Sequence, residues 1–247
     1  MEYPLILING GIPRSGTVLV GRILTALCQA NRLGVARLNI SEPRETPALA
    51  RYIREHQGPE VLLVHVHVTS DEVMAALAAR DDTRIFWNVR DPRDAMVSLK
   101  QLHDLELDRA IWAMDKFLEF AEAASSQATI LKYEAMVGDP PGFVRFLAER
   151  TGLSCSPSQV DDIVRQTSPA AHRKIMERLS PGAEGTRTLE TMTRTLVEDE
   201  ATLINDRHIQ SGAAGRWKAE LTPEEQTRVT EAMWRWVDRL DYPRAGE

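Results

Sequence analysis

A glycine-rich turn near the start of the chain holds residue types that bind anions. It runs from Gly10 to Thr17, between the apolar segment Leu5–Asn9 and a helical pattern over residues 16–30, and it contains Arg14. Backbone N–H groups in such a turn, together with the N-terminus of the following helix, attract negative charge. An arginine in the turn adds a fork of donors for phosphate or sulfate oxygens. The turn therefore indicates an anion site, with a plain strand-to-helix connection as the alternative.

The spacing of this turn is that of a Walker A loop without its lysine. Counted from Gly11, the residues follow the pattern Gly-x-x-x-x-Gly, and Thr17 stands where the Walker loop has lysine. A loop without that lysine is poorly suited to the β- and γ-phosphates of ATP. Because the basic residue is Arg14 instead, the sequence favours another phosphate or sulfate ligand.

A second candidate anion site begins at Arg90, the residue that follows an apolar run. Ser98 lies eight residues later, on an expected helix. The carboxyl ends of parallel strands open onto one edge of a sheet, so we expect Arg90 on the same side as the glycine-rich turn. An arginine and a hydroxyl can together hold a second phosphate. The alternative is that residues 91–94 form only a helix start with a surface ion pair, worth at most about 1 kcal/mol.

Short apolar runs alternate with amphipathic stretches over the first two thirds of the chain. This order is typical of an α/β protein with a doubly wound parallel sheet of about five strands and helices on both faces. Thr46 is the expected N-cap of the second helix, with Pro47 at its first position. The expected strands cover residues 5–9, 35–40, 61–68, 84–89 and 129–132, and the expected helices cover residues 16–30, 46–57, 71–80, 91–103 and 106–125.

The C-terminal part is predicted to be mainly helical. Helices are expected over residues 141–151 and 157–166, and a capping box at Thr222 begins a last helix that runs to about Leu240. Residues 168–220 contain few apolar residues and several glycines, so they are expected to be irregular and partly mobile, in the manner of a lid. Nothing in the sequence requires a second domain, and we expect one domain over residues 1–247.

Composition excludes several classes of protein. The chain has 30 Lys+Arg against 36 Asp+Glu, a net charge of −6, which argues against broad binding to nucleic acid or to an anionic membrane. Its two cysteines, Cys28 and Cys155, cannot form a multi-disulfide framework and match no zinc pattern. No segment has the pattern of a targeting signal or a membrane span, so a cytoplasmic location is expected.

Four blocks of the sequence, in this order, resemble motifs of the sulfotransferases that use 3′-phosphoadenosine 5′-phosphosulfate (PAPS). The glycine-rich turn resembles their 5′-phosphosulfate loop, and the segment from Arg90 to Ser98 resembles their 3′-phosphate motif. The segment from Lys132 to Pro140 is similar to their Tyr-Glu segment, and residues 212–218 resemble their C-terminal Gly-x-x-Gly-x-Trp-Lys loop. Together the blocks span residues 11–218.

The resemblance implies a P-loop-like α/β fold and transfer of a sulfuryl group from PAPS to a hydroxyl or amine. The product would be 3′,5′-phosphoadenosine, and no metal would be required. Arg14 would bind the bridging region and the sulfate oxygens, Arg90 and Ser98 the 3′-phosphate, and Tyr133 would lie near the adenine. The resemblance assigns the 5′-phosphate to the N–H groups of Ser15, Gly16, Thr17 and Val18.

The sequence departs from this family in two places. Many soluble members have lysine where Arg14 stands, whereas the tyrosylprotein-type enzymes have arginine. Many members also have Arg-Lys-Gly before the C-terminal loop, and here the aligned residues are Gln210, Ser211 and Gly212. A cofactor contact by Ser211 and Gly212 would be weaker, or a neighbour such as Arg207 or Arg216 would replace it.

Two residues are candidates for the base that removes the acceptor's proton. His67 ends the third expected strand and matches the histidine of the family's Lys-x-His block, with His65 in the place of the lysine. An imidazole suits this role because its ordinary pKa is near 6.5. Glu42 is the alternative, since tyrosylprotein-type enzymes place a catalytic glutamate in a similar turn. A carboxylate there also fits a simple helix start.

Two other functions remain open at this point. One is a P-loop kinase of a small molecule that uses ATP, which would need magnesium and the missing lysine. The other is a catalytically inactive nucleotide-binding scaffold, which both base candidates disfavour. The acceptor of a transferase would be a small molecule, a sugar or a peptide. The sequence does not distinguish among these and does not indicate an oligomeric state.

Overall fold

The computed structural model describes residues 5–40, 43–67, 70–124, 127–190, 195–207 and 212–243. Two predicted site residues, Glu42 and Ser211, lie outside these ranges. The chain divides into two compact units, which we describe one at a time. The first contains residues 1–90 and 116–164, and the second contains residues 91–115 and 165–247. The expectation of a single domain stays a prediction.

The first unit is built on a parallel sheet of five strands in the order β2-β3-β1-β4-β5. Every residue of β1 and β3 is buried, which explains why these strands read as continuous apolar runs rather than alternating ones. The predicted α/β class and the number of parallel strands are confirmed. The strands cover Ile6–Gly11 (β1), Val35–Ile40 (β2), Val61–Val66 (β3), Thr83–Val89 (β4) and Thr129–Lys132 (β5).

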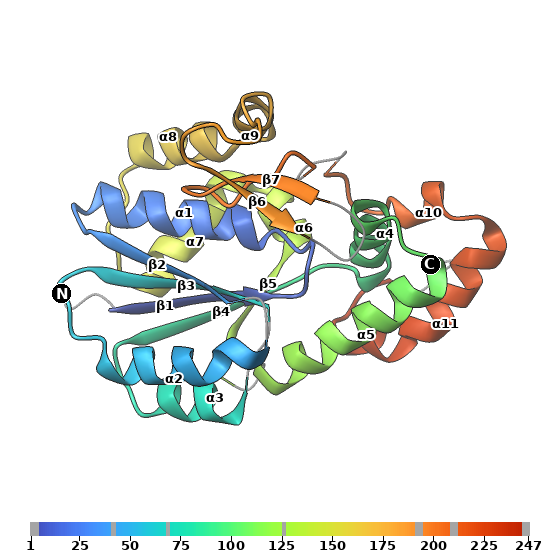
Figure 1. Ribbon diagram of the computed structural model, residues 1–247, viewed down its shortest axis with the longest axis horizontal. Coiled ribbons are helices and arrows are strands. Elements are labelled where there is room, and N and C mark those ends of the chain that lie inside the picture. Colours follow the sequence, from blue (N-terminus) through green and yellow to red (C-terminus); the bar gives the residue numbers. More distant parts are fainter. Residues whose placement is uncertain are drawn as a thin grey trace. The chain divides into compact units, whose positions relative to one another are not determined.

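Helices cover both faces of this sheet (Figure 1). Helices α1 (Thr17–Ala30) and α7 (Pro140–Thr151) lie on one face, and α2 (Thr46–Glu55) and α3 (Asp71–Ala78) lie on the other. The chain moves one way along the sheet from β1 to β2 and the opposite way from β2 through β3 to β4. Because parallel crossovers are right-handed, this reversal puts the connecting helices on opposite faces.

One hydrophobic core of the first unit lies between the sheet and the two helices α1 and α7. The side chains that meet there come from alternate positions of the strands and from one face of each helix. Fully or almost fully buried members include Leu7, Leu24, Leu63, Phe86 and Leu147. This packing fixes where β1 ends and α1 begins, and therefore the geometry of the glycine-rich turn between them.

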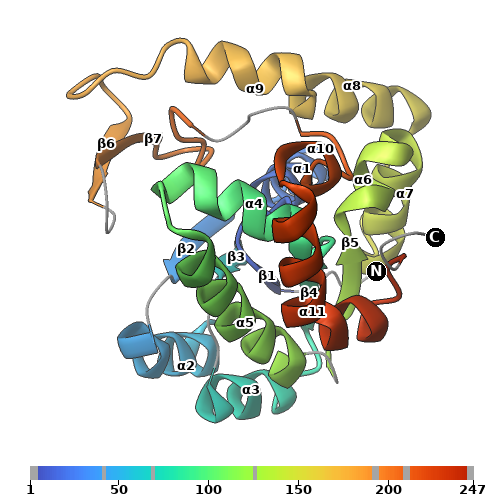
Figure 2. The ribbon, with the colours of Figure 1, turned by 90° about the vertical axis from the view of Figure 1, so that its right-hand side faces the viewer.

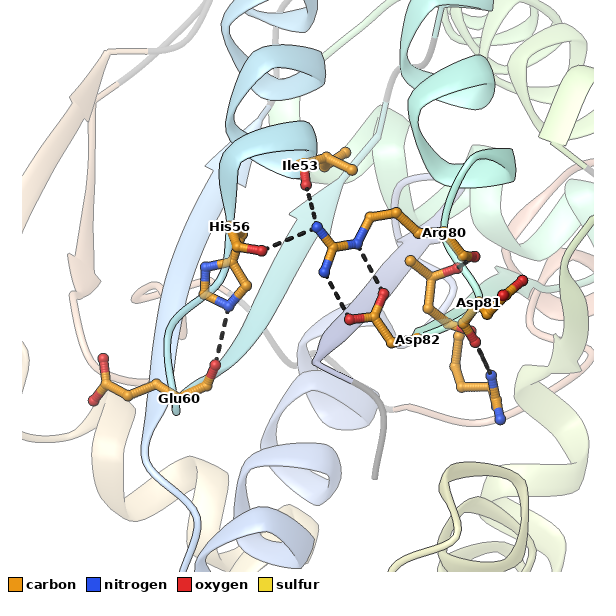
Figure 3. Close-up of polar contacts among 8 residues, drawn as sticks. Ile53, His56, Glu60, Arg80, Asp81 and Asp82 are labelled. Atoms are coloured by element: carbon orange, nitrogen blue, oxygen red, sulfur yellow. Dashed lines mark hydrogen bonds and ion pairs between the residues drawn. The ribbon is translucent and has the colours of Figure 1, made fainter. Parts of the chain in front are cut away.

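Arg80 joins the ends of α2 and α3 (Figure 3). Its guanidinium donates to both carboxylate oxygens of Asp82, at 2.8 and 2.6 Å, and to the carbonyls of Ile53 and His56, at 3.0 and 2.9 Å. These carbonyls belong to the last turn of α2 and to the residue after it, where helical acceptors lack partners. The hydrogen bonds from Arg80 hold the pKa of Asp82 below its usual value.

The second unit is mainly helical, as predicted, and its helices α4, α10 and α11 pack against one another (Figure 2). The capping box predicted at Thr222 is present, because Thr222 and Glu225 exchange hydrogen bonds between side chain and backbone. Its elements are α4 (Pro92–His103), α9 (Pro169–Met176), β6 (Thr186–Glu190), β7 (Thr195–Asp199), α10 (Trp217–Glu220) and α11 (Pro223–Arg239). Helices α5 (Leu107–Ala124) and α8 (Pro157–Thr167) each run from one unit into the other, and α6 (Tyr133–Gly138) belongs to the first.

The expectation of an irregular segment over residues 168–220 is wrong in part. Helices α9 and α10 lie within it, and β6 and β7 form an antiparallel pair. The pair is held across its register by Arg187, whose guanidinium lies 2.6 Å from Oε1 of Glu198. Threonines and charged residues dominate both strands, so their hydrophobic pattern is too weak to identify them. The lid role stays a prediction.

The start of α2 also differs from the prediction. The N-cap is Glu45, and Thr46 is the first helical residue. A short 3-10 turn over Pro43–Glu45 leads directly into the helix, so the backbone is already helical before Thr46. The threonine therefore does not have the extended conformation that an N-cap requires.

Candidate active site

The glycine-rich turn has the conformation of an anion-binding loop. Gly16 is the N-cap of α1 with a φ of 90°, in the left-handed region that favours glycine. The first helical hydrogen bond runs from Val20 to the carbonyl of Gly16. The N–H groups of Thr17 and Val18 come before that bond, so they have no acceptor within the helix. These are two of the four donors that the sequence assigns to the 5′-phosphate.

Buried polar side chains stabilise the turn through hydrogen bonds to its backbone carbonyls. Asn88 donates to Oδ1 of Asn9 at 2.8 Å and to the carbonyl of Gly10 at 2.6 Å. Asn9 in turn donates to the carbonyl of Thr17 at 2.7 Å, and Ser15 donates to the carbonyl of Ile12 at 2.6 Å. Sequence reasoning missed the two asparagines as supports of the turn. The available signal was an amide side chain at the carboxyl end of each of two apolar strands, β1 and β4.

Arg14 occupies a strained position within the turn. Its φ is 68°, a left-handed conformation that costs a non-glycine residue of order 1–3 kcal/mol. Such strain persists where the surroundings enforce it, and it is concentrated at functional sites. Its charge acts on the ring of His67, which places the predicted sulfate-binding arginine near the predicted base.

Three predicted cofactor residues meet beside the turn. The guanidinium carbon of Arg90 lies 4.3 Å from the centroid of the Tyr133 ring. A Cβ atom added to Gly16 would come within 3.0 Å of that same ring. Arg90 follows β4, and Tyr133 follows β5 at the start of α6, so the parallel sheet brings both to the edge where the turn lies. The structure therefore gathers Gly16, Arg90 and Tyr133, as the sequence predicts.

His67 lies against the same turn, one residue beyond the end of β3. Its Nδ1 is 2.8 Å from the carbonyl oxygen of Gly11, and its backbone N–H donates to the carbonyl of Ile40. Its Nε2 is 3.3 Å from Nε2 of His65, and the two rings meet edge to face with centroids 4.9 Å apart. Residues two apart on a strand point to the same face, and the sequence did not predict that the two rings touch.

Burial dominates the protonation of both histidines. It lowers the pKa of His65 well below its usual value, and the ring of His67 lowers that pKa further. Burial also lowers the pKa of His67, and although its hydrogen bond with Gly11 acts in the opposite direction, the charge of Arg14 adds to the lowering. Both rings are therefore neutral at pH 7, and a neutral imidazole is the form that accepts a proton.

A cavity of about 680 Å³ opens between β2 and α2 in the first unit. Ile40, whose carbonyl accepts the backbone hydrogen bond of His67, is one of its lining residues, whereas His67 itself is not. Asn39 also lines it, and Oδ1 of Asn39 is buried and accepts no hydrogen bond from the described residues. The other lining residues are Leu38, Arg44, Glu45, Ala48, Leu49, Arg51, Tyr52 and Glu55.

In the second unit, Asp94 holds the loop that precedes α10. Its carboxylate is fully buried and accepts hydrogen bonds from the backbone N–H groups of Gly215, at 2.7 Å, and Trp217, at 3.0 Å. This loop is the Gly-x-x-Gly-x-Trp-Lys block of the sequence. One residue of the Arg90–Ser98 block therefore fixes the backbone of another block more than a hundred residues away.

The alternative of a surface ion pair at residues 91–94 is wrong. Arg93 is 1 % exposed and forms a paired contact with the Asp91 carboxylate at 2.9 and 2.7 Å. The guanidinium also lies 4.1 Å from the ring centroid of Trp217 and donates to the carbonyl of Pro243. Spacing alone suggests an exposed helix start, whereas the packing of α4 against α10 and α11 buries these charges.

The remaining predicted cofactor residues are placed as follows. Ser98 is buried on α4, which belongs to the second unit. Arg90 belongs to the first unit and ends its first segment, residues 1–90. Arg216 is mostly buried, and its guanidinium donates to Glu220 and Gln101. Gly212 has a φ of 68°, in the left-handed region. The cofactor roles of all these residues stay predictions.

The match to known proteins identifies the family. The sulfotransferase domain matches residues 6–241, so the chain belongs to the sulfotransferase family. The predicted enzyme class and reaction type, transfer of a sulfuryl group, are confirmed, and nothing supports the kinase alternative. No curated protein matches the chain in a comparison of sequences.

Solved structures of sulfotransferases share the fold. Mouse sulfotransferase SULT7A1, complexed with PAP, has a TM-score of 0.66 at 14% identity, over 98% of this chain and 86% of that one. Retinol dehydratase in a complex with retinol and PAP has a TM-score of 0.62 at 17% identity, over 98% and 84%. Retinol dehydratase with androsterone and the inactive cofactor PAP has a TM-score of 0.60 at 15% identity, over 100% and 84%.

Proposed function

We propose that this sulfotransferase takes its sulfuryl group from PAPS and transfers it to a hydroxyl group of a small molecule. The observation that carries the proposal is the meeting of the glycine-rich turn, Arg90, Tyr133 and His67 at one edge of the sheet. The phosphate and sulfate groups of PAPS suit the N–H groups at the start of α1 and the two arginines Arg14 and Arg90. The PAP named for all three of these similar structures agrees with this donor.

The chain's own residues would act in the following way. The N–H groups of Thr17 and Val18 bind the 5′-phosphate, and Arg14 binds the sulfate oxygens as charge moves onto the leaving phosphate. Nε2 of His67 removes the acceptor's proton while the acceptor oxygen bonds to sulfur. The bond from sulfur to the bridging oxygen breaks, and 3′,5′-phosphoadenosine leaves. No metal ion takes part in this proposal, because the arginines and backbone donors supply the positive charge.

Ligand-induced thermal stabilisation tests the donor. A ligand that binds only the folded state at a hundredfold excess over its Kd stabilises that state by about 2.7 kcal/mol. We expect 3′,5′-phosphoadenosine to raise the Tm, and ATP with magnesium to leave it unchanged. A panel of small alcohols, phenols and amines with ³⁵S-labelled PAPS then identifies an acceptor. A shift with ATP and magnesium alone contradicts the proposal.

The cavity between β2 and α2 is proposed as the acceptor site. Its volume of about 680 Å³ lies within the usual range for small-molecule pockets, and the carbonyl of its lining residue Ile40 accepts the backbone hydrogen bond of His67. Apolar side chains such as Leu38, Leu49 and Tyr52 would contact the carbon skeleton of the acceptor.

Filling the cavity tests this acceptor site. Ala48 lines the cavity from the exposed side of α2, so Ala48→Trp would occupy part of the space without disturbing the core. We expect at least a tenfold rise in the KM of the acceptor found in the panel, which is about 1.4 kcal/mol. The thermal shift with 3′,5′-phosphoadenosine should stay as in the wild type. Equal KM values for variant and wild type would place the acceptor elsewhere.

We also propose a cytoplasmic location. Both Cys28 and Cys155 are free thiols, which suits a reducing compartment. Within the described residues, no helix is long and apolar enough to cross a membrane.

A further inference from the structure

His65 and His67 form a pair, and the proposed role of His67 as the base leaves His65 without a function. The two Nε2 atoms lie 3.3 Å apart, and the rings meet edge to face. His65 is almost fully buried on β3, between Asn9 of β1 and Asn39 of β2 in the sheet register. A second imidazole thus faces the nitrogen that would remove the acceptor's proton.

The contact with Gly11 determines where the proton of His67 lies. A carbonyl oxygen only accepts hydrogen bonds, so Nδ1 of His67, 2.8 Å away, must carry a proton. In a neutral ring the other nitrogen is then unprotonated, and Nε2 of His67 is an acceptor. The 3.3 Å contact is favourable only if Nε2 of His65 carries its proton. For two neutral rings, both contacts are hydrogen bonds only when His67 carries its proton on Nδ1 and His65 carries its proton on Nε2.

We infer that His65 is a positioning residue that donates its Nε2–H to Nε2 of His67 and holds the base in its unprotonated, reactive tautomer. The inference rests on the proposed role of His67 as the base. When an acceptor hydroxyl arrives, it takes over this contact and donates to the same Nε2. In this role His65 contacts neither the acceptor nor PAPS and acts only through His67.

The charges around the pair agree with this role. A hydrogen bond to the neutral form of a base disfavours its protonated form, so the donor from His65 keeps the pKa of His67 low. Burial acts on both rings in the same direction, and Arg14 adds its positive charge near His67. Arg14 acts on the ring of His67 through its charge, His65 contacts it at Nε2, and the Gly11 carbonyl contacts it at Nδ1.

Nitrogen NMR of the wild-type protein tests the tautomers directly. With ¹⁵N-labelled histidine at pH 7.5, we expect His67 to be protonated on Nδ1 and His65 on Nε2. His65→Gln and His67→Gln spectra assign the signals. A proton on Nε2 of His67 would overturn the inference. This measurement needs neither PAPS nor an acceptor, so it stands even if the proposed function fails.

Two substitutions at His65 test the consequence for catalysis. His65→Phe keeps the bulk of the ring but removes the donor, whereas His65→Gln keeps an N–H donor. We expect the acid limb of the kcat/KM profile to move up by about one pH unit in the phenylalanine variant. In the glutamine variant it should stay at the wild-type position. Equal shifts in both variants, or none in either, would show that His65 only fills space.

The two proposals fail in distinguishable ways. If His67→Gln keeps wild-type turnover, His67 is not the base, whatever the tautomers are. If His67→Gln loses turnover but the His65 variants leave the pH profile unchanged, the base is correct and the role of His65 is wrong. Thermal shifts with 3′,5′-phosphoadenosine confirm that each variant is folded. Where a variant does not fold, the wild-type NMR measurement decides.

Discussion

Replacing His67 by glutamine is expected to lower kcat by about 10²–10⁴-fold, the usual contribution of a general base. Glutamine can still donate to the Gly11 carbonyl but cannot accept a proton. The measurement is turnover of ³⁵S-labelled PAPS with the acceptor found in the panel. Because the pKa of His67 lies below its usual value, the wild-type enzyme should also keep activity below pH 6.5.

The control for this prediction is the competing base candidate. Glu42→Gln should leave kcat within a fewfold of the wild type if His67 is the base. The thermal shift with 3′,5′-phosphoadenosine should survive in both variants, since neither side chain is assigned to the nucleotide. The opposite pattern, with turnover lost in the Glu42 variant and kept in the His67 variant, would assign the base to the glutamate.

Replacing Asp94 by alanine is expected to destabilise the protein by about 3 kcal/mol, because two backbone N–H groups, one of them on the buried Trp217, lose a charged acceptor. The donors are those of Gly215 and Trp217, and no water reaches a carboxylate that is fully buried. For a chain of this size, Tm changes by about 2–4 °C per kcal/mol, so the fall should be roughly 6–12 °C. Thermal unfolding followed by circular dichroism measures it.

Asp108 supplies the matched control in the same unit. Its side chain is 72% exposed and pairs with Arg228 at the surface. Exposed pairs contribute about 0–1 kcal/mol, so Asp108→Ala should change the Tm by only a few degrees. If the two variants unfold at the same temperature, the carboxylate of Asp94 does not stabilise the loop.

Sequence reasoning succeeded where local patterns carry the information. The strands over residues 35–40 and 129–132 were predicted with their observed bounds, and the other strands differ by one or two residues. A buried parallel strand needs a continuous apolar run, which is visible without a structure. The turn from Gly10 to Thr17 was identified in the same way, because only certain residue types allow such a backbone.

Sequence reasoning failed where a residue's role depends on distant parts of the chain. The ion pair of Asp91 and Arg93 looked exposed, since nothing nearby shows that Trp217 and Pro243 cover it. The strands β6 and β7 were missed because their stabilising contacts are cross-strand pairs of polar side chains. Tertiary packing buries the ion pair in the first case, and cross-strand pairing determines the strands in the second.

The sequence by itself determined the class of fold, the anion-binding turn and the set of residues from which the site is made. Each of these depends on spacing within about ten residues, which backbone geometry converts directly into position. The tertiary structure decided which of those residues meet. The ring of His67, the proposed base, lies 2.8 Å from the carbonyl of Gly11, which is 56 residues earlier in the chain. Such contacts arise from the parallel pairing of strands that are distant in the chain, and no local pattern encodes them.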